Sequence, residues 1–172
     1  GKSADDHYAF YSADKALDII SKNDGDFALF YDVVSMPGIT NNTLTDKLID
    51  LIDNSDNGRK DALAIIDIDD GYLESYENNG TRTGGNVDTV IQAVDDRKLN
   101  SSYVASYYPR VRMRDTLRGN GDVFVSPSSV AGLGAIAYSD AVSEPWFAPA
   151  GFNRGGISIL GGNAGPRVIG TH

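Results

Sequence analysis

The order of apolar and polar segments predicts an α/β fold, a layered domain with a mixed, largely parallel sheet flanked by helices. Two observations predict it. Helical patterns alternate with short apolar runs along the chain, and the runs at 27–34 and 62–68 are dominated by apolar residues, as in strands buried on both faces. No internal repeat or low-complexity linker interrupts the 172 residues, so we expect a single domain over 1–172.

The N-terminal half supplies two helices, two strands and a loop. A helix is predicted from Ser12, a good cap, to Asn23 (12–23), and 27–34 is predicted as a buried strand. Thr43 caps a second amphipathic helix, predicted over 43–54, and 62–68 is the second buried strand. The segment 71–86 is polar and contains four glycines, so we expect an exposed loop.

The C-terminal half continues the alternation with shorter elements. We predict a helix over 86–98 capped by its first residue, an alternating strand over 102–114, a brief strand over 123–125, a helix over 126–138 and a last strand over 157–160. The remainder, from residue 161 onward, is expected to be a loose end.

The composition excludes several function classes. The formal net charge is −9, whereas nucleic-acid binding needs clustered Lys and Arg. Cysteine is absent, which excludes disulfides, thiol catalysis and cysteine-bound zinc. The only histidines, His7 and His172, lie near the two ends and give a Ser-His-Asp triad little to use. No apolar run approaches the roughly 18 residues of a membrane span, and residues 1–6 lack a signal-peptide layout.

The segment AIIDIDDG (64–71) is the best enzyme candidate. A strand ending in Asp67-x-Asp69 can present carboxylates at the edge of a sheet where open α/β folds bind ligands and Mg²⁺. The alternative function is therefore a Mg²⁺-dependent phosphohydrolase using Asp67 and Asp69. Hydrolases of the haloacid-dehalogenase type begin this way but normally carry Thr or Val where this chain has Gly71. Aspartates before a glycine turn are also common turn formers, and this structural interpretation is favoured.

The segment GLGAIA (132–137) is a partial match to the dinucleotide fingerprint. That fingerprint requires a preceding strand in a βαβ unit, and here a Pro-Ser-Ser segment precedes the glycines. The pattern favours a tightly packed helix that needs small residues.

Arginines alternate with apolar residues in PRVRMR (109–114). In a strand this alternation places Arg110, Arg112 and Arg114 on one face. In an acidic protein these arginines can pair with carboxylates of a neighbouring molecule. A solvated strand face with intramolecular pairs is an equally consistent interpretation.

The segment EPWFAPAGFNRGG (144–156) holds the only tryptophan. Trp146 and Phe147 are too apolar for an ordinary solvent loop, while the prolines and glycines disfavour a helix or a central strand. Two interpretations stay open. Residue chemistry favours packing of Trp146 and Phe147 against the sheet; the other interpretation is a binding module that uses them as an exposed patch.

Five unusual segments follow one another over roughly residues 27–156. They are SMPGITNN (35–42), RKDALAIID (59–67), SSYVASYYPRVRM (101–113), VFVSPSSVAGLGAIAYSD (123–140) and PWFAPAGFNRGG (145–156). As an ordered set they resemble the tail sheath proteins of contractile-tailed bacteriophages. Sheath proteins usually carry Pro-Pro-Ser before the small-residue helix, where this chain has Ser126-Pro127-Ser128. Sheath chains are also considerably longer, so the chain resembles one part of a larger sheath subunit.

The resemblance implies a structural subunit with no enzymatic activity and no cofactor. Sheath subunits stack as rings around a rigid tube, and their collective contraction drives the tube through the host envelope for genome ejection. The implied partners are copies of the chain, the tail tube protein, and baseplate and tail terminator proteins, without nucleic acid or membrane insertion. The implied location is the tail sheath of the virion, after assembly in the host cytoplasm.

Two sets of residues gain a role from the resemblance. The candidate subunit-contact residues are Arg110, Arg112 and Arg114. The candidate residues of a rigid structural joint, beyond the small-residue helix, are Trp146, Phe147, Pro149 and Gly151.

Overall fold

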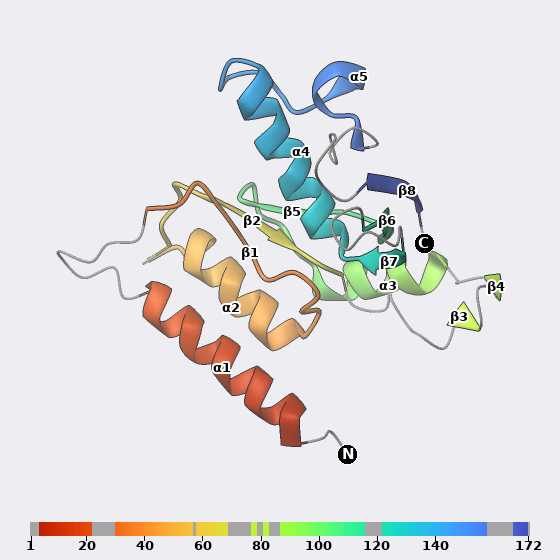
Figure 1. Ribbon diagram of the computed structural model, residues 1–172. Helices are drawn as coiled ribbons and strands as arrows, with labels where there is room; N and C mark the ends of the chain where they lie inside the picture. Colours follow the sequence, from red (N-terminus) through yellow and green to blue (C-terminus); the bar gives the residue numbers. More distant parts are fainter. Residues whose placement is uncertain are drawn as a thin grey trace.

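Three parallel strands form the centre of the fold in the computed structural model (Figure 1). β1 (Val33–Ser35), β2 (Leu63–Ile66) and β5 (Val104–Ser106) pair in the order β1-β2-β5, all parallel. The predicted α/β class is confirmed. The structure describes residues 4–21, 30–56, 58–68, 77–78, 81–82, 87–115, 122–157 and 167–171.

Helices cover both faces of this sheet. α2 (Asn42–Asp53) and α3 (Val87–Arg97) connect neighbouring parallel strands and lie on one face, with α1 (Ala4–Ser21) packed outside α2 (Figure 1). α4 (Ser128–Val142) lies on the other face, against β2. The main core lies between α1, α2 and β2, and its buried members are Leu17, Leu44, Leu48, Ile52, Ala62, Ala64 and Ile66.

Two helices begin earlier than the sequence pattern predicts. α1 begins at Ala4, so Ser12 lies inside the helix and caps nothing. Phe10 explains the extension, because it packs against the core as Leu17 does. Burial of these apolar side chains stabilises the longer helix by more than a serine cap would. In α2 the cap is Asn41, whose side-chain oxygen accepts a hydrogen bond from Leu44 N at 3.3 Å, and Thr43 lies within the first turn.

An ion-pair network joins α1 to α2. Lys47 Nζ lies 2.5 Å from Asp14 Oδ1 and 2.6 Å from Asp18 Oδ1. Hydrogen bonds from Lys47, and then from Lys15, lower the pKa of Asp18, while bonds to Asp14 and Asp18 raise the pKa of Lys47. The three side chains are about one-third exposed, so water and salt weaken the network.

Replacing Lys47 with methionine is expected to reduce the pH dependence of stability. The Asp18 contribution is complete above its ordinary pKa of 3.8 and is lost as pH falls through the lowered value. The Lys47 contribution is complete below 10.5 and is lost as pH rises through the raised value. Thermal unfolding between pH 2 and pH 12 at low salt tests this prediction. If the melting temperature of Lys47→Met depends on pH as that of the unmodified protein does, in both the acid and the alkaline range, the prediction is contradicted. Lys98→Met is the control, because Lys98 is exposed.

A second sheet is antiparallel, with the order β7-β6-β8. It contains β7 (Val123–Ser126), β6 (Val111–Arg114) and β8 (Arg167–Thr171). The single strand predicted over 102–114 is wrong, because the chain forms β5 in one sheet and β6 in the other. Pro109 lies between them and has no N–H to continue a ladder. The loose end predicted from residue 161 is also wrong, because β8 pairs with β6.

Other predicted boundaries are corrected in part. Only Val33 and Val34 of the strand predicted over 27–34 are extended in β1, and Phe30 is 92% exposed; residues 27–29 lie outside the described residues. Within the loop predicted over 71–86, β3 (Glu77–Asn78) and β4 (Thr81–Arg82) form a short antiparallel pair, and the rest lies outside the described residues. Of the strand predicted over 157–160, Ile157 is not extended and the others lie outside the described residues.

Candidate functional site

The carboxylate of Asp67 lies just beyond β2 and is 3% exposed. Its Oδ2 accepts hydrogen bonds from Gly38 N at 2.7 Å and from Ser129 Oγ at 2.8 Å. Its Oδ1 accepts from Ser129 N at 3.0 Å and lies 3.1 Å from Ser128 Oγ, whose shorter contact is to the Tyr107 carbonyl oxygen at 2.6 Å. We name this group of residues the Asp67 junction.

Asp67 acts as the missing cap of α4. The residue before the helix, Pro127, has no side chain that accepts a hydrogen bond, although the first backbone N–H groups of a helix need acceptors. Asp67 supplies that acceptor from a position 62 residues earlier in the chain. Its negative charge also interacts favourably with the helix N-terminus. Asp67 therefore connects β2, the turn at Gly38 and α4.

This geometry favours the structural interpretation of Asp67 over a phosphohydrolase nucleophile. A nucleophilic carboxylate needs an oxygen that a substrate can reach, whereas both oxygens of Asp67 are buried and hydrogen-bonded. Asp69 lies outside the described residues. Within the parts of the chain that the structure describes, His, Asp and Glu form no group of three that could hold a metal ion.

Four of the five sheath-like segments meet at the Asp67 junction. Gly38 comes from 35–42 and Asp67 from 59–67, while Tyr107 belongs to 101–113 and the two serines to 123–140. The sequence did not predict that these segments contact one another. The available signal was the pair of serines after Pro127, because hydroxyl groups at a helix start commonly take part in capping.

The GLGAIA segment packs closely against this junction. Gly132 in α4 is buried, and a Cβ atom added there would lie 2.5 Å from Cε2 of Tyr107. The strand before the helix, β7, is antiparallel to its neighbour, so the βαβ context of a dinucleotide site is missing. The predicted packing of small residues is therefore confirmed at Gly132, whereas Ala137 is exposed.

Gly132→Ala is expected to lower the free energy of unfolding by no more than about 1 kcal/mol, because the added methyl group meets the ring of Tyr107, a side chain that is 41% exposed and can turn away. Urea unfolding measures the change. In a Tyr107→Ala background the same substitution should become neutral or stabilising, since alanine favours a helix by about 1 kcal/mol over glycine. Equal destabilisation in both backgrounds would contradict the proposed contact.

The arginine strand is only partly as predicted. In β6, Val111 and Met113 face the protein interior, while Arg112 and Arg114 are exposed on the opposite face. Arg110 precedes β6, is partly buried and makes a contact of its own. We name the surface of Arg112 and Arg114 the basic face.

β8 pairs with β6, the strand that carries the basic face. Arg114 is directly opposite Arg167 of β8, whereas Arg112 is opposite Gly170. The basic face is therefore the candidate contact surface in a chain whose net charge is −9.

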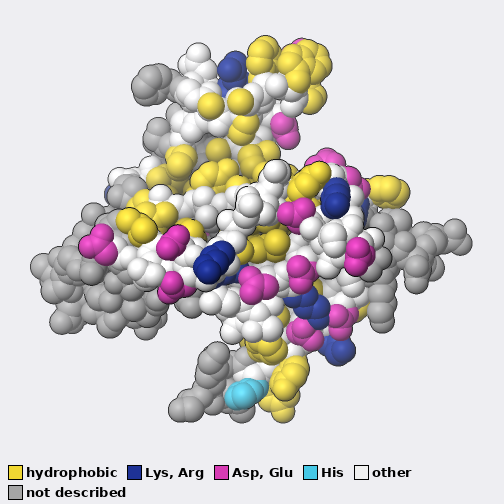
Figure 2. All heavy atoms as spheres, turned by 180° about the vertical axis from the view of Figure 1, so that it is seen from behind, with side chains coloured by type: hydrophobic (Ala, Val, Ile, Leu, Met, Phe, Trp, Pro, Cys, Tyr) yellow, Lys and Arg dark blue, Asp and Glu magenta, His cyan; other side chains and the backbone are white. Residues whose placement is uncertain are grey.

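The segment 144–150, which we name the aromatic turn, does not pack against the sheet. Trp146 is 77% exposed and Phe147 is 45% exposed, so the expected packing is wrong. α4 extends beyond the sheet and carries the turn with it, and apolar side chains gather there at the top of the molecule (Figures 1 and 2). Pro149 and Gly151 are exposed too, and Gly151 begins the short helix α5 (Gly151–Arg154) with a φ of +79°. The role of these four residues as a rigid joint stays a prediction.

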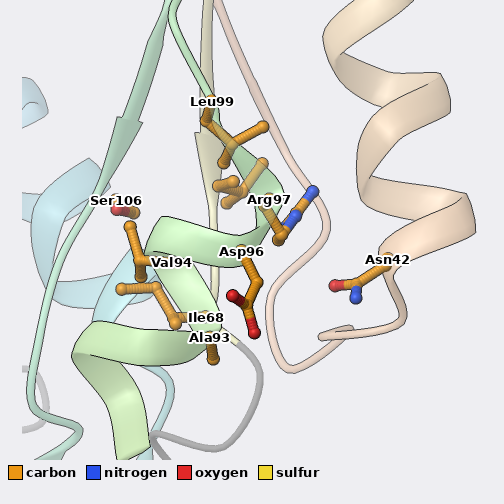
Figure 3. Close-up of a pocket in the computed structure, with 9 residues that line it drawn as sticks. Asn42, Ile68, Ala93, Val94, Asp96, Arg97, Leu99 and Ser106 are labelled. Atoms are coloured by element: carbon orange, nitrogen blue, oxygen red, sulfur yellow. The ribbon is translucent and has the colours of Figure 1, made fainter. Parts of the chain in front are cut away.

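A hollow of about 290 Å³ lies at the carboxyl ends of β2 and β5, the edge of the sheet where the sequence predicted Asp67 and Asp69, but Asp67 does not line it. Asn42 of α2 and Asp96 of α3 lie on its walls, with Ile68 and Val94 among its apolar lining (Figure 3). Arg97 also lines it. The guanidinium of Arg97 donates to Thr45 Oγ1 at 3.0 Å and pairs with Asp46, so its charge is already compensated by α2. The hollow therefore indicates no particular class of ligand.

Comparison with protein-family models, curated proteins and solved structures finds no match. Among the helices that the structure describes, none is both long and apolar enough to cross a membrane.

Proposed function

We propose that the chain is a structural subunit of a contractile phage tail sheath. In this function it polymerises around the tail tube, and the sheath contracts to drive the tube through the host envelope for genome ejection. Its partners are copies of itself, the tail tube protein, and baseplate and tail terminator proteins. It is assembled in the host cytoplasm and belongs to the tail of the virion.

The observation that carries the proposal is the Asp67 junction. Four of the five segments that resemble sheath proteins contribute atoms to it, and each contribution has a defined structural purpose. A subunit that rotates as a solid body during contraction needs its layers held in a fixed arrangement. Buried polar groups that find hydrogen-bond partners across the layers support such rigidity.

The charge distribution supports assembly as well. A helical array requires contacts between two different patches of each subunit, repeated without closure. Acidic side chains are spread over the middle of the molecule, so a basic face on one copy has acidic surface to meet on the next (Figure 2).

The proposal is tested by electron microscopy of the protein expressed from the complete reading frame that encodes residues 1–172. The expected result is regular tubes or stacked rings, with or without added tube protein. Two results would overturn it. One is the absence of ordered assembly under both conditions; the other is phosphatase activity that is lost in an Asp67→Asn variant that stays folded.

A further inference from the structure

The aromatic turn exposes large apolar side chains to water. Trp146 is the most exposed large side chain of this region, and Phe147, Val142 and Ile157 are exposed near it in the chain. Apolar side chains clustered at one end of a molecule commonly mark an interaction site. Arg154 stacks over the Phe147 ring at 4.7 Å and adds a positive charge to the same end.

A second apolar surface is concave and lies between α1 and β1. This hollow, which we name the α1–β1 hollow, has a volume of about 270 Å³ and an almost entirely apolar wall. The volume is below that of most sites for small ligands, and it suits one or two large side chains. Its wall includes Ala13, Ala16, Ile20, Val34, Met36 and Ile39.

The two surfaces lie far apart in one copy. The aromatic turn lies beyond α4 on one side of the parallel sheet, whereas α1 lies outside α2 on the other side (Figure 1). A turn cannot reach the hollow of its own chain in this arrangement. It can reach the hollow of a second copy.

We infer that Trp146 of one copy inserts into the α1–β1 hollow of the next copy. The contact joins two different patches, so it continues from copy to copy without closing, as a helical array requires. The inference rests on the proposed function for its place in a sheath. It adds to that function the residues that form one contact between subunits. It is also separate from the basic face, which lies on β6.

Charge supports the choice of a second copy as the occupant. α1, which forms one wall of the hollow, contains four aspartates and one lysine, and with Lys47 of α2, which pairs with Asp14 and Asp18, the formal charge is −4 + 1 + 1 = −2. Arg154 accompanies the aromatic turn and is partly buried, and its buried Nε has no hydrogen-bond partner among the described residues. Insertion brings this cation toward an acidic helix. The area of a single turn is small for a stable interface, so each contact is weak and gains strength through repetition.

The only tryptophan of the chain gives a direct measurement. As the concentration of the purified chain rises, the Trp146 emission should shift to shorter wavelength, because the indole leaves water. Ala16→Phe fills the hollow from within each copy and should abolish this shift. Ile91→Phe, at an exposed position of α3 away from the hollow, is the matched control and should preserve it. An unchanged shift in Ala16→Phe, or no shift at any concentration, would overturn the inference.

Cross-linking identifies the two surfaces independently. The chain has no cysteine, so single cysteines are unique probes. A mixture of Ala148→Cys and Ala16→Cys chains, treated with a short bismaleimide, should give cross-linked dimers at least five-fold above either chain alone. Adding Trp146→Ser to the Ala148→Cys chain should remove most of this product. Dimers formed equally well by Ala148→Cys alone would show that two turns meet each other, and would overturn the inference.

The complete reading frame separates this inference from the proposed function. Ordered assemblies that persist with Trp146→Ser would overturn the contact and leave the proposed function in place. Absence of ordered assembly in the unmodified protein would contradict the proposed function, while the emission and cross-linking results would still decide whether two copies meet in this way.

Discussion

Asp67→Asn is expected to lower the free energy of unfolding by about 2–4 kcal/mol. Asparagine offers one acceptor oxygen, and its amide group would face a donor, because Gly38 N, Ser129 N and Ser129 Oγ approach the two carboxylate oxygens from different sides. At least one buried donor is then left without an acceptor. The substitution also removes the negative charge at the start of α4.

Urea unfolding followed by far-UV circular dichroism measures this effect. Asp32→Asn is the matched control, because Asp32 is exposed and its hydrogen bond with Leu63 N uses the backbone carbonyl. The control should change stability by no more than about 0.5 kcal/mol. If Asp67→Asn is as stable as the control, the capping of α4 by Asp67 is contradicted.

The same variant separates the two functions considered for this chain. A phosphohydrolase nucleophile can be replaced with loss of activity and little loss of stability, since active-site residues are commonly not optimised for stability. Replacing a structural cap lowers stability and removes no phosphatase activity. The direction of the Asp67→Asn result therefore bears on function as well as on fold.

Local patterns predicted the elements whose structure depends on local sequence. The spacing of Leu44, Leu48 and Ile52 identifies the buried side of α2, and the apolar run at 62–68 identifies β2, which is the central strand. The alternation of β6 also places Val111 and Met113 inside and Arg112 outside. In these cases neighbouring residues determine which side is buried.

Features that depend on distant partners could not be predicted in the same way. β8 is a strand because β6 pairs with it, and nothing in its own five residues requires this. The cap of α4 comes from Asp67, 62 residues away from Ser129. Apolar content also misled the interpretation of Trp146, since the side chain is exposed at the end of a helix that extends past the sheet. Sequence alone identified the unusual residues, but the structure decides whether each packs within the chain or faces outward.

The double variant Arg112→Glu, Arg114→Glu is expected to prevent ordered assembly of the complete reading frame. Both side chains are exposed, so the fold should lose less than about 1 kcal/mol. Reversing two charges turns attraction to an acidic neighbour into repulsion, which costs several kcal/mol at each contact. Because every subunit repeats the contact, the loss accumulates along the array.

Sedimentation and electron microscopy measure this loss of assembly. Lys60→Glu, Lys98→Glu is the matched control, because it changes the net charge by the same amount at two exposed lysines far from β6 in the sequence. Arg112→Lys, Arg114→Lys keeps the charge and should retain partial assembly, with a stronger dependence on salt, since lysine lacks the bidentate geometry of arginine. If the charge-reversed protein assembles as the control does, the basic face is not a subunit contact. Because the aromatic turn lies elsewhere, loss of assembly in the charge-reversed protein should leave the cross-linking of Ala148→Cys to Ala16→Cys intact.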